Sequence, residues 1–159
     1  FTTWANRFDS DMPPVKAERV DDGEVFALGN GQVESISIPG HSSDGMGYWI
    51  PDQKMMVVGT LIPRADRPTR WDLPGGCLPD LITSLQRILS FQPKSLIPLQ
   101  GPAIKGEQHI REVIEQHIDF FQKCLDDEGQ VPRSVPRPAQ TALWYSPHPP
   151  WPLKENESL

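Results

Sequence analysis

The feature that most limits the fold is a run of four short strand-like segments separated by turns within residues 24–58. The second segment alternates polar and apolar residues, as a strand with one buried face does. The turn before it contains Asn30-Gly31, and Asn-Gly is the strongest short hairpin signal. The fourth segment is apolar at every position and is predicted to be a central strand buried on both faces. The four segments are 24–28, 32–38, 46–50 and 55–58.

Two helical patterns and one more strand follow these segments. Apolar residues recur at helical spacing in 79–91 and again in about 105–125. Between them, 95–99 is predicted to be a strand, with Pro98 marking an edge or a strand end. The long connection 61–76 is of the kind that usually carries or covers a site. The pattern predicts an α+β domain with a mostly antiparallel sheet and two helices.

Three regions divide the chain. Residues 1–23 are expected to be irregular, and 24–128 to form the folded domain. The segment 129–159 holds seven of the 18 prolines, together with Trp144 and Trp151. Such a composition predicts an extended Pro-rich C-terminal arm that lays its aromatic rings on another surface. Because the sequence begins with Phe rather than Met, we expect a trimmed, processed or partial chain.

Charge and hydropathy exclude some classes of function. The net charge is −6, whereas a nucleic-acid binder needs clustered Lys and Arg. No apolar run approaches the roughly 20 residues that span a bilayer, so no membrane partner is expected. Two cysteines, Cys77 and Cys124, are too few for a disulfide scaffold. We expect a cytoplasmic protein with reduced thiols, a disulfide being the alternative.

Several motifs occur in a fixed order. Pro39-Gly40-His41 follows a predicted strand, and Gly59-Thr60 follows the apolar one. A loop with Asp72 and a helix with Ser84-Leu85 come next, and then Pro98-Leu99-Gln100-Gly101-Pro102. In order and spacing these motifs resemble the C-terminal half of a metallo-β-lactamase-fold hydrolase, from about residue 22 to 125.

The resemblance implies metal-assisted hydrolysis, in which bound metal lowers the pKa of a water molecule. His41 stands at the position of a metal ligand. Thr60 replaces the Asp that bridges two metals in the family, and Gln100 replaces the last His ligand. Neither is a good zinc ligand. The resemblance therefore implies one divalent ion, zinc or iron/manganese, with Thr60, Gln100 and Trp71 as substrate-binding residues.

The resemblance also implies a partner. The family fold is an αββα sandwich of two halves, and an isolated half would expose an apolar sheet face. We expect a hetero-oligomer in which a partner subunit supplies the N-terminal half and its His-x-His-x-Asp-His ligands, a second copy of this chain being the alternative partner. The function would be hydrolysis of a small molecule, such as an aromatic ether or ester, since one two-subunit member cleaves dinitroanisole. The alternative is a non-catalytic interaction or regulatory protein with a degenerate, metal-free fold.

Structural roles compete with these functional ones. His41 could cap its loop, Thr60 and Gln100 could be ordinary polar residues, and Trp71 could belong to the core. We expect two acidic residues of the long loop, Asp66 and Asp72, to pair with nearby arginines. The two histidines of the second helix are expected at the surface or boundary; these are His109 and His117.

Overall fold

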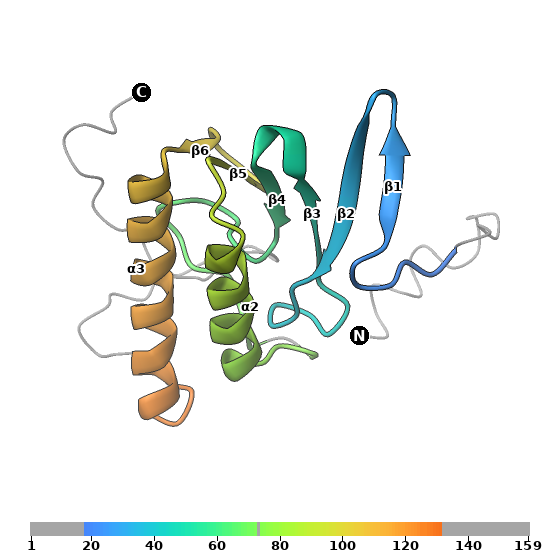
Figure 1. Ribbon diagram of the computed structural model, residues 1–159. Coiled ribbons are helices and arrows are strands. Elements are labelled where there is room, and N and C mark those ends of the chain that lie inside the picture. The colour runs from blue at the N-terminus through green and yellow to red at the C-terminus, as the bar shows by residue number, and fades with distance from the viewer. Residues whose placement is uncertain (1–17, 73, 132–159) are drawn as a thin grey trace.

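The computed structural model describes residues 18–72 and 74–131 and builds them around one six-stranded sheet. The strands follow one another across the sheet in chain order (Figure 1). The first four pair antiparallel, β4 and β5 pair parallel, and β5 and β6 pair antiparallel. The strands are β1 (Val25–Leu28), β2 (Gly31–Ser37), β3 (Met46–Ile50), β4 (Met55–Gly59), β5 (Ser95–Pro98) and β6 (Ile104–Lys105).

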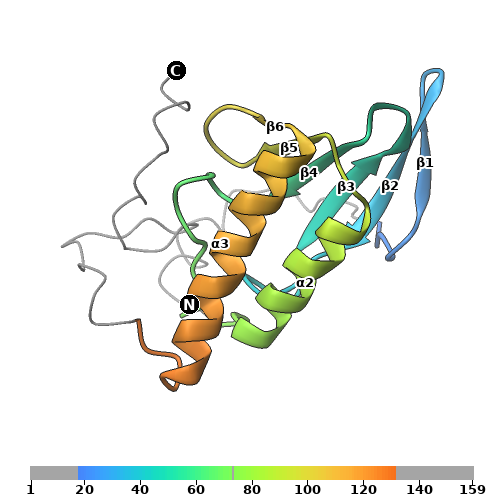
Figure 2. The same ribbon diagram turned by 60° about the vertical axis from the view of Figure 1, so that its left-hand side comes forward.

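Two long helices lie on the same face of the sheet (Figures 1 and 2). Helix α2 (Leu78–Ser90) crosses over from β4 to β5, which is what a parallel strand pair requires. It has a proline in its first turn, where the missing N–H costs nothing. Helix α3 (Glu107–Asp126) follows β6, and a short 3-10 turn, η1 (Pro51–Gln53), joins β3 to β4.

The core lies between the helices and the sheet face that they cover. Cross-strand register places Trp49, Met56 and Leu96 on this face, and all three are buried. Trp49 also contacts Phe91, at a ring-centroid distance of 5.4 Å. The helices contribute six of the large apolar side chains that are completely buried or nearly so, which are Leu81, Leu85, Ile88, Ile110, Ile114 and Phe121.

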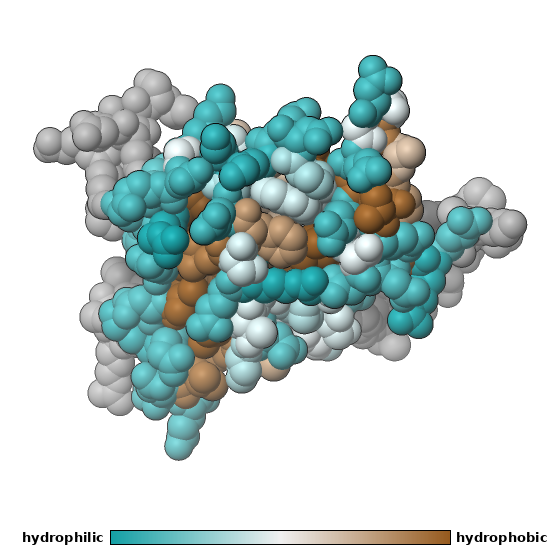
Figure 3. Space-filling view, in the orientation of Figure 1, coloured by the Kyte–Doolittle hydropathy of each residue, from teal (hydrophilic) through white to brown (hydrophobic). Residues whose placement is uncertain are grey.

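The opposite face of the sheet carries apolar side chains that α2 and α3 do not cover. Tyr48, Val57 and Ile97 are in register on this face. Tyr48 is 39% exposed, and Val57 and Ile97 are half-buried. We call this surface the open sheet face. On the helix side, apolar side chains surface mainly where the two helices meet and around the β1–β2 hairpin (Figure 3).

The predicted arrangement is confirmed in the described residues: they form an α+β fold with a mostly antiparallel sheet and two helices. Three details differ. Val57 is only half-buried, so β4 is not buried on both faces. The β6 strand was not predicted, because two residues are too short to show an alternation. The third concerns only one of two alternatives: Pro98 ends β5, which confirms the predicted strand end, and β5 is an inner strand, which excludes the edge.

The terminal regions remain predictions. Most of the first segment, 1–23, and nearly all of the Pro-rich arm, 129–159, lie outside the described residues. The domain boundaries at 24 and 128 are therefore not tested. Within the part of the chain that the structure describes, no helix is long and apolar enough to cross a membrane.

Candidate functional site

The loop between β2 and β3 places His41 against the start of α2. Gly40 has φ +131°, and a Cβ there would lie 2.6 Å from Leu81. The Gly40 carbonyl accepts a hydrogen bond from the Cys77 N–H at 2.8 Å. The Ser84 hydroxyl donates to the Pro39 carbonyl at 2.8 Å. Glycine is thus required for close approach, and the loop is fixed from both sides.

The hydrogen bonds of His41 define its tautomer. Its Nδ1 lies 2.9 Å from the Arg70 carbonyl oxygen and 3.0 Å from Thr69 Oγ1. Because a carbonyl oxygen can only accept, this contact assigns a proton to Nδ1, and in the neutral ring Nε2 then keeps its lone pair. Metal-binding histidines are oriented in this way, by donating their other N–H to a carbonyl or carboxylate. The half-buried His41 therefore has the protonation pattern of a metal ligand.

Thr69 and Arg70, the two hydrogen-bond partners of His41, belong to the long loop after β4. Two arginine–carboxylate pairs stabilise this loop. The guanidinium of Arg64 donates to both oxygens of the buried Asp66, at 2.8 and 2.9 Å. Arg70 pairs in the same way with Asp72 through its Nε, at 2.8 Å. This hydrogen bond to Asp72 raises the pKa of Arg70 above its ordinary value. The predicted pairing of the acidic residues with nearby arginines is confirmed.

Trp71 belongs to this loop and packs on helix α3. Its ring meets Phe120 and Phe121 edge-on, at centroid distances of 5.9 and 5.7 Å. The side chain is half-buried and contacts the core cluster. The structure thus gives Trp71 a packing role, and its binding role stays a prediction.

His117 is buried, so the prediction of a surface or boundary position is wrong. Its exposed fraction is 0%, and its ring contacts Phe121. Burial lowers the pKa of His117 below its ordinary value, although nearby carbonyl groups and the Asp66 charge oppose this. The sequence does carry a signal of this burial: His117 continues the apolar stripe of α3, three residues after Ile114 and four before Phe121.

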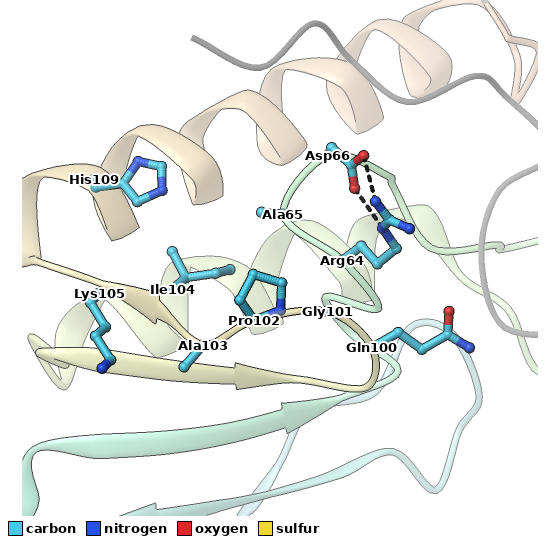
Figure 4. Close-up of a pocket in the computed structure, with 10 residues that line it drawn as sticks. All are labelled: Arg64, Ala65, Asp66, Gln100, Gly101, Pro102, Ala103, Ile104, Lys105 and His109. Atoms are coloured by element: carbon cyan, nitrogen blue, oxygen red, sulfur yellow. Dashed lines mark hydrogen bonds and ion pairs between the residues drawn. The ribbon is translucent and has the colours of Figure 1, made fainter. Parts of the chain in front are cut away.

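Thr60 and Gln100 follow neighbouring parallel strands, as the motif comparison expects. Both are half-buried. The backbone N–H of Gln100 donates to the Pro63 carbonyl at 2.9 Å. Gln100 lines one end of a cavity of about 230 Å³ beneath the long loop, and His109 lies at the other end (Figure 4). His109 is half-buried, which confirms its predicted boundary position.

The described residues do not form a metal centre by themselves. Among residues 18–72 and 74–131, no group of three His, Cys, Asp or Glu side chains could hold an ion. Of the three positions that the resemblance equates with metal ligands, His41 alone offers a good donor, because Thr60 and Gln100 provide a hydroxyl and an amide. This donor set therefore fits one ligand of a metal, and the others would have to come from elsewhere.

The two cysteines have different environments. Both are free thiols. Cys77 is half-buried beside the His41 loop, whereas Cys124 is buried in α3. Burial, helped by the negative charge of Asp127, raises the pKa of the Cys124 thiol to about 12. Cys124 is therefore a core residue and a poor nucleophile at neutral pH.

Comparisons with known proteins show that this fold is similar to that of metallo-β-lactamase-fold proteins. No protein-family model matches the chain. A β-lactamase-like protein 2 homolog of Caenorhabditis elegans is 28% identical over 111 residues, covering 69% of this chain and 36% of its own. Glyoxylase B2 of Dictyostelium discoideum is 35% identical over 70 residues, covering 44% of this chain and 24% of its own.

Solved structures agree on the fold. A metallo-β-lactamase family protein from Thermus thermophilus superposes with a TM-score of 0.63 at 17% identity, covering 72% of this chain and 38% of its own. A protein solved in a di-iron-bound form gives a TM-score of 0.51 at 26% identity, covering 65% of this chain and 51% of its own. The chain thus spans less than half the length of the curated relatives described above.

Proposed function

We propose that this chain is one half of a metal-dependent hydrolase and contributes His41 to a metal site. The observation that carries the proposal is the hydrogen bond between His41 Nδ1 and the Arg70 carbonyl, which leaves Nε2 available. The remaining ligands would come from a partner subunit that carries His-x-His-x-Asp-His and supplies the other half of the fold.

The open sheet face supports the need for a partner. Tyr48, Val57 and Ile97 form a row across three adjacent strands, on the face opposite the helices. The same face of a sandwich would be covered by a second sheet about 10 Å away. A complementary sheet from a partner subunit would cover this row and give a hetero-oligomer. The arm, 129–159, would add aromatic contacts to the same partner.

A single divalent ion is the cofactor that the donor set supports best. One relative in fold was solved in a di-iron-bound form. Here Thr60 and Gln100 lack the carboxylate and imidazole that a second ion would need. We propose zinc, or iron/manganese, shared between the two subunits. Thr60, Gln100 and Trp71 would contact a small-molecule substrate, for which we propose an aromatic ether or ester.

The test is metal retention by the assembled complex. The native protein is purified with whatever chain it binds, and its metal content is measured by elemental analysis. His41→Ala should lower the content by about one ion per copy of this chain, because three-ligand sites rarely survive the loss of one ligand. His109→Ala is the matched control, since His109 lies on α3 in the cavity wall. Equal metal content in both variants would overturn the proposal.

A second function is favoured by the weak donors at Thr60 and Gln100. With no three-donor group among the described residues, the chain could serve as a non-catalytic interaction or regulatory protein. In that case the purified chain would be stable by itself and free of metal. A folded, monodisperse, metal-free protein that captures no complementary half would favour this alternative over the hydrolase.

A further inference from the structure

His117 links helix α3 to the loop that orients His41. Its Nδ1 lies 2.8 Å from the Val113 carbonyl, one turn back on the same helix. Its Nε2 lies 3.2 Å from the carbonyl of Arg67, fifty residues away in the long loop. The imidazole thus contacts two backbone acceptors on two different elements.

The contact falls just before the residues that hold His41. Arg67 is followed, two and three residues later, by Thr69 and Arg70, whose oxygens lie at 3.0 and 2.9 Å from His41 Nδ1. Thr69 is completely buried. Movement of the backbone at Arg67 would therefore displace both hydrogen-bond acceptors of His41.

Packing around His117 favours a positioning role over simple space filling. An apolar side chain would fill the same volume against Phe121 without placing polar nitrogens in the core. A buried polar ring is costly unless its nitrogens are hydrogen-bonded. Both nitrogens face carbonyl oxygens, and a neutral ring has one N–H to donate. In the Nε2–H form this N–H donates to the Arg67 carbonyl and so ties the loop to α3.

We infer that His117 is a positioning residue that, through the loop segment 67–70, sets the orientation and tautomer of His41. The consequence of this positioning for a metal site rests on the proposed function, in which His41 is a metal ligand. The contacts from His117 to the loop, and from the loop to His41, lie within this chain and need no metal.

The experiment uses the full 159-residue chain, labelled with ¹⁵N and free of added metal. Long-range ¹H–¹⁵N spectra report which ring nitrogen of His41 carries the proton. His117→Phe keeps an aromatic ring beside Phe121 and removes both ring nitrogens. We expect it to shift His41 from the Nδ1–H form to a mixture and to speed amide exchange in segment 67–70 by about tenfold.

Two further variants separate positioning from general stability. His117→Gln keeps an amide N–H that can reach the Arg67 carbonyl and should restore most of the Nδ1–H form. Ile110→Val removes one methyl group from the buried face of α3, at a position outside the contact between His117 and the loop. It should leave the His41 tautomer unchanged. If His117→Phe does not fold, His117→Leu, which also lacks both ring nitrogens, takes its place, and an unchanged Nδ1–H form in that folded variant would overturn the inference.

An unchanged His41 tautomer in a folded His117→Phe protein would overturn the inference. An equal shift in Ile110→Val would also overturn it, because the effect would then follow core stability. Failure of the hydrolase proposal would instead appear in the metal content of the complex, with these spectra unaffected.

Discussion

The two loops that correspond to metal-ligand loops in the family differ in how tightly they are built. The His41 loop is pressed onto α2 and receives hydrogen bonds on both sides of Gly40. The loop after β5, which contains Gln100, is open: a Cβ on Gly101 would meet nothing within 4 Å. Of the two loops, the one that contains His41 is therefore the more tightly constrained.

The largest expected effect comes from adding one methyl group to each loop. Gly40→Ala forces a Cβ to 2.6 Å from Leu81 at a positive φ and should lower the free energy of unfolding by about 3 kcal/mol. Gly101→Ala, at φ +84° with open space, should cost about 1 kcal/mol, from backbone strain alone. Urea denaturation measures the free energy of unfolding of both variants. Similar losses in the two would show that the two loops are equally constrained.

A smaller effect is expected from removing one hydroxyl. Thr69→Val deletes an oxygen 3.0 Å from His41 Nδ1 in a completely buried position. The free energy of unfolding should fall by about 1 kcal/mol. Thr60→Val, at a half-buried position, should change it by less than about 0.5 kcal/mol. Thermal unfolding with both variants checks this, and the opposite ranking would count against a special role for the His41 surroundings.

Acidification should destabilise the chain through His117, which lies beneath the loop that holds His41. Burial lowers its folded-state pKa below the ordinary 6.5, so the unfolded chain binds the proton more readily. The free energy of unfolding should fall as the pH drops through 6.5, until the folded-state pKa is reached. The Asp66 carboxylate, paired with Arg64, is the charged group that opposes this.

Urea denaturation between about pH 8 and pH 5 measures this slope. His117→Gln has no titrating group at this position and should show a flatter profile. His41 and His109 are present in both proteins, so the difference isolates His117. A wild-type profile as flat as that of the variant would show that His117 is not the proton acceptor.

The smallest effect is expected at Gln100. Its backbone N–H holds the loop through the Pro63 carbonyl, and that bond survives any side-chain change. Gln100→Ala should therefore alter the free energy of unfolding by less than about 0.5 kcal/mol. A loss above about 1 kcal/mol, measured by denaturation, would mean that this loop is as constrained as that of His41.

Local pattern predicted most of the fold. Alternation and turn signals located β2 and β3 within a residue or two, and helical spacing located α2 and α3. What it could not locate were features set by distant segments. The β6 strand exists because Ser95 and Leu96 offer it an edge, and two residues carry no pattern of their own. The exposure of Val57 depends on what covers the sheet, which residues 55–58 do not encode.

The site was predictable only in part. The motif placed His41 correctly on a tight loop, but its acceptors lie 28 and 29 residues away and no spacing rule links them. His117 was missed because a histidine in an amphipathic helix is usually taken as polar. Its position on the stripe with Ile114 and Phe121 would have placed it inside.

The order of the strands has a consequence for how the chain folds. Each strand pairs with the strand before it in the chain, and among the described strands only β5 must wait for a long crossover, through the long loop and α2. Such a meander has mostly local contacts, and low contact order favours fast folding. The hairpin of β1 and β2 can form as soon as it leaves the ribosome, with α2 as the only long detour before β5. With this strand order, the described sheet can form strand by strand from β1 to β6.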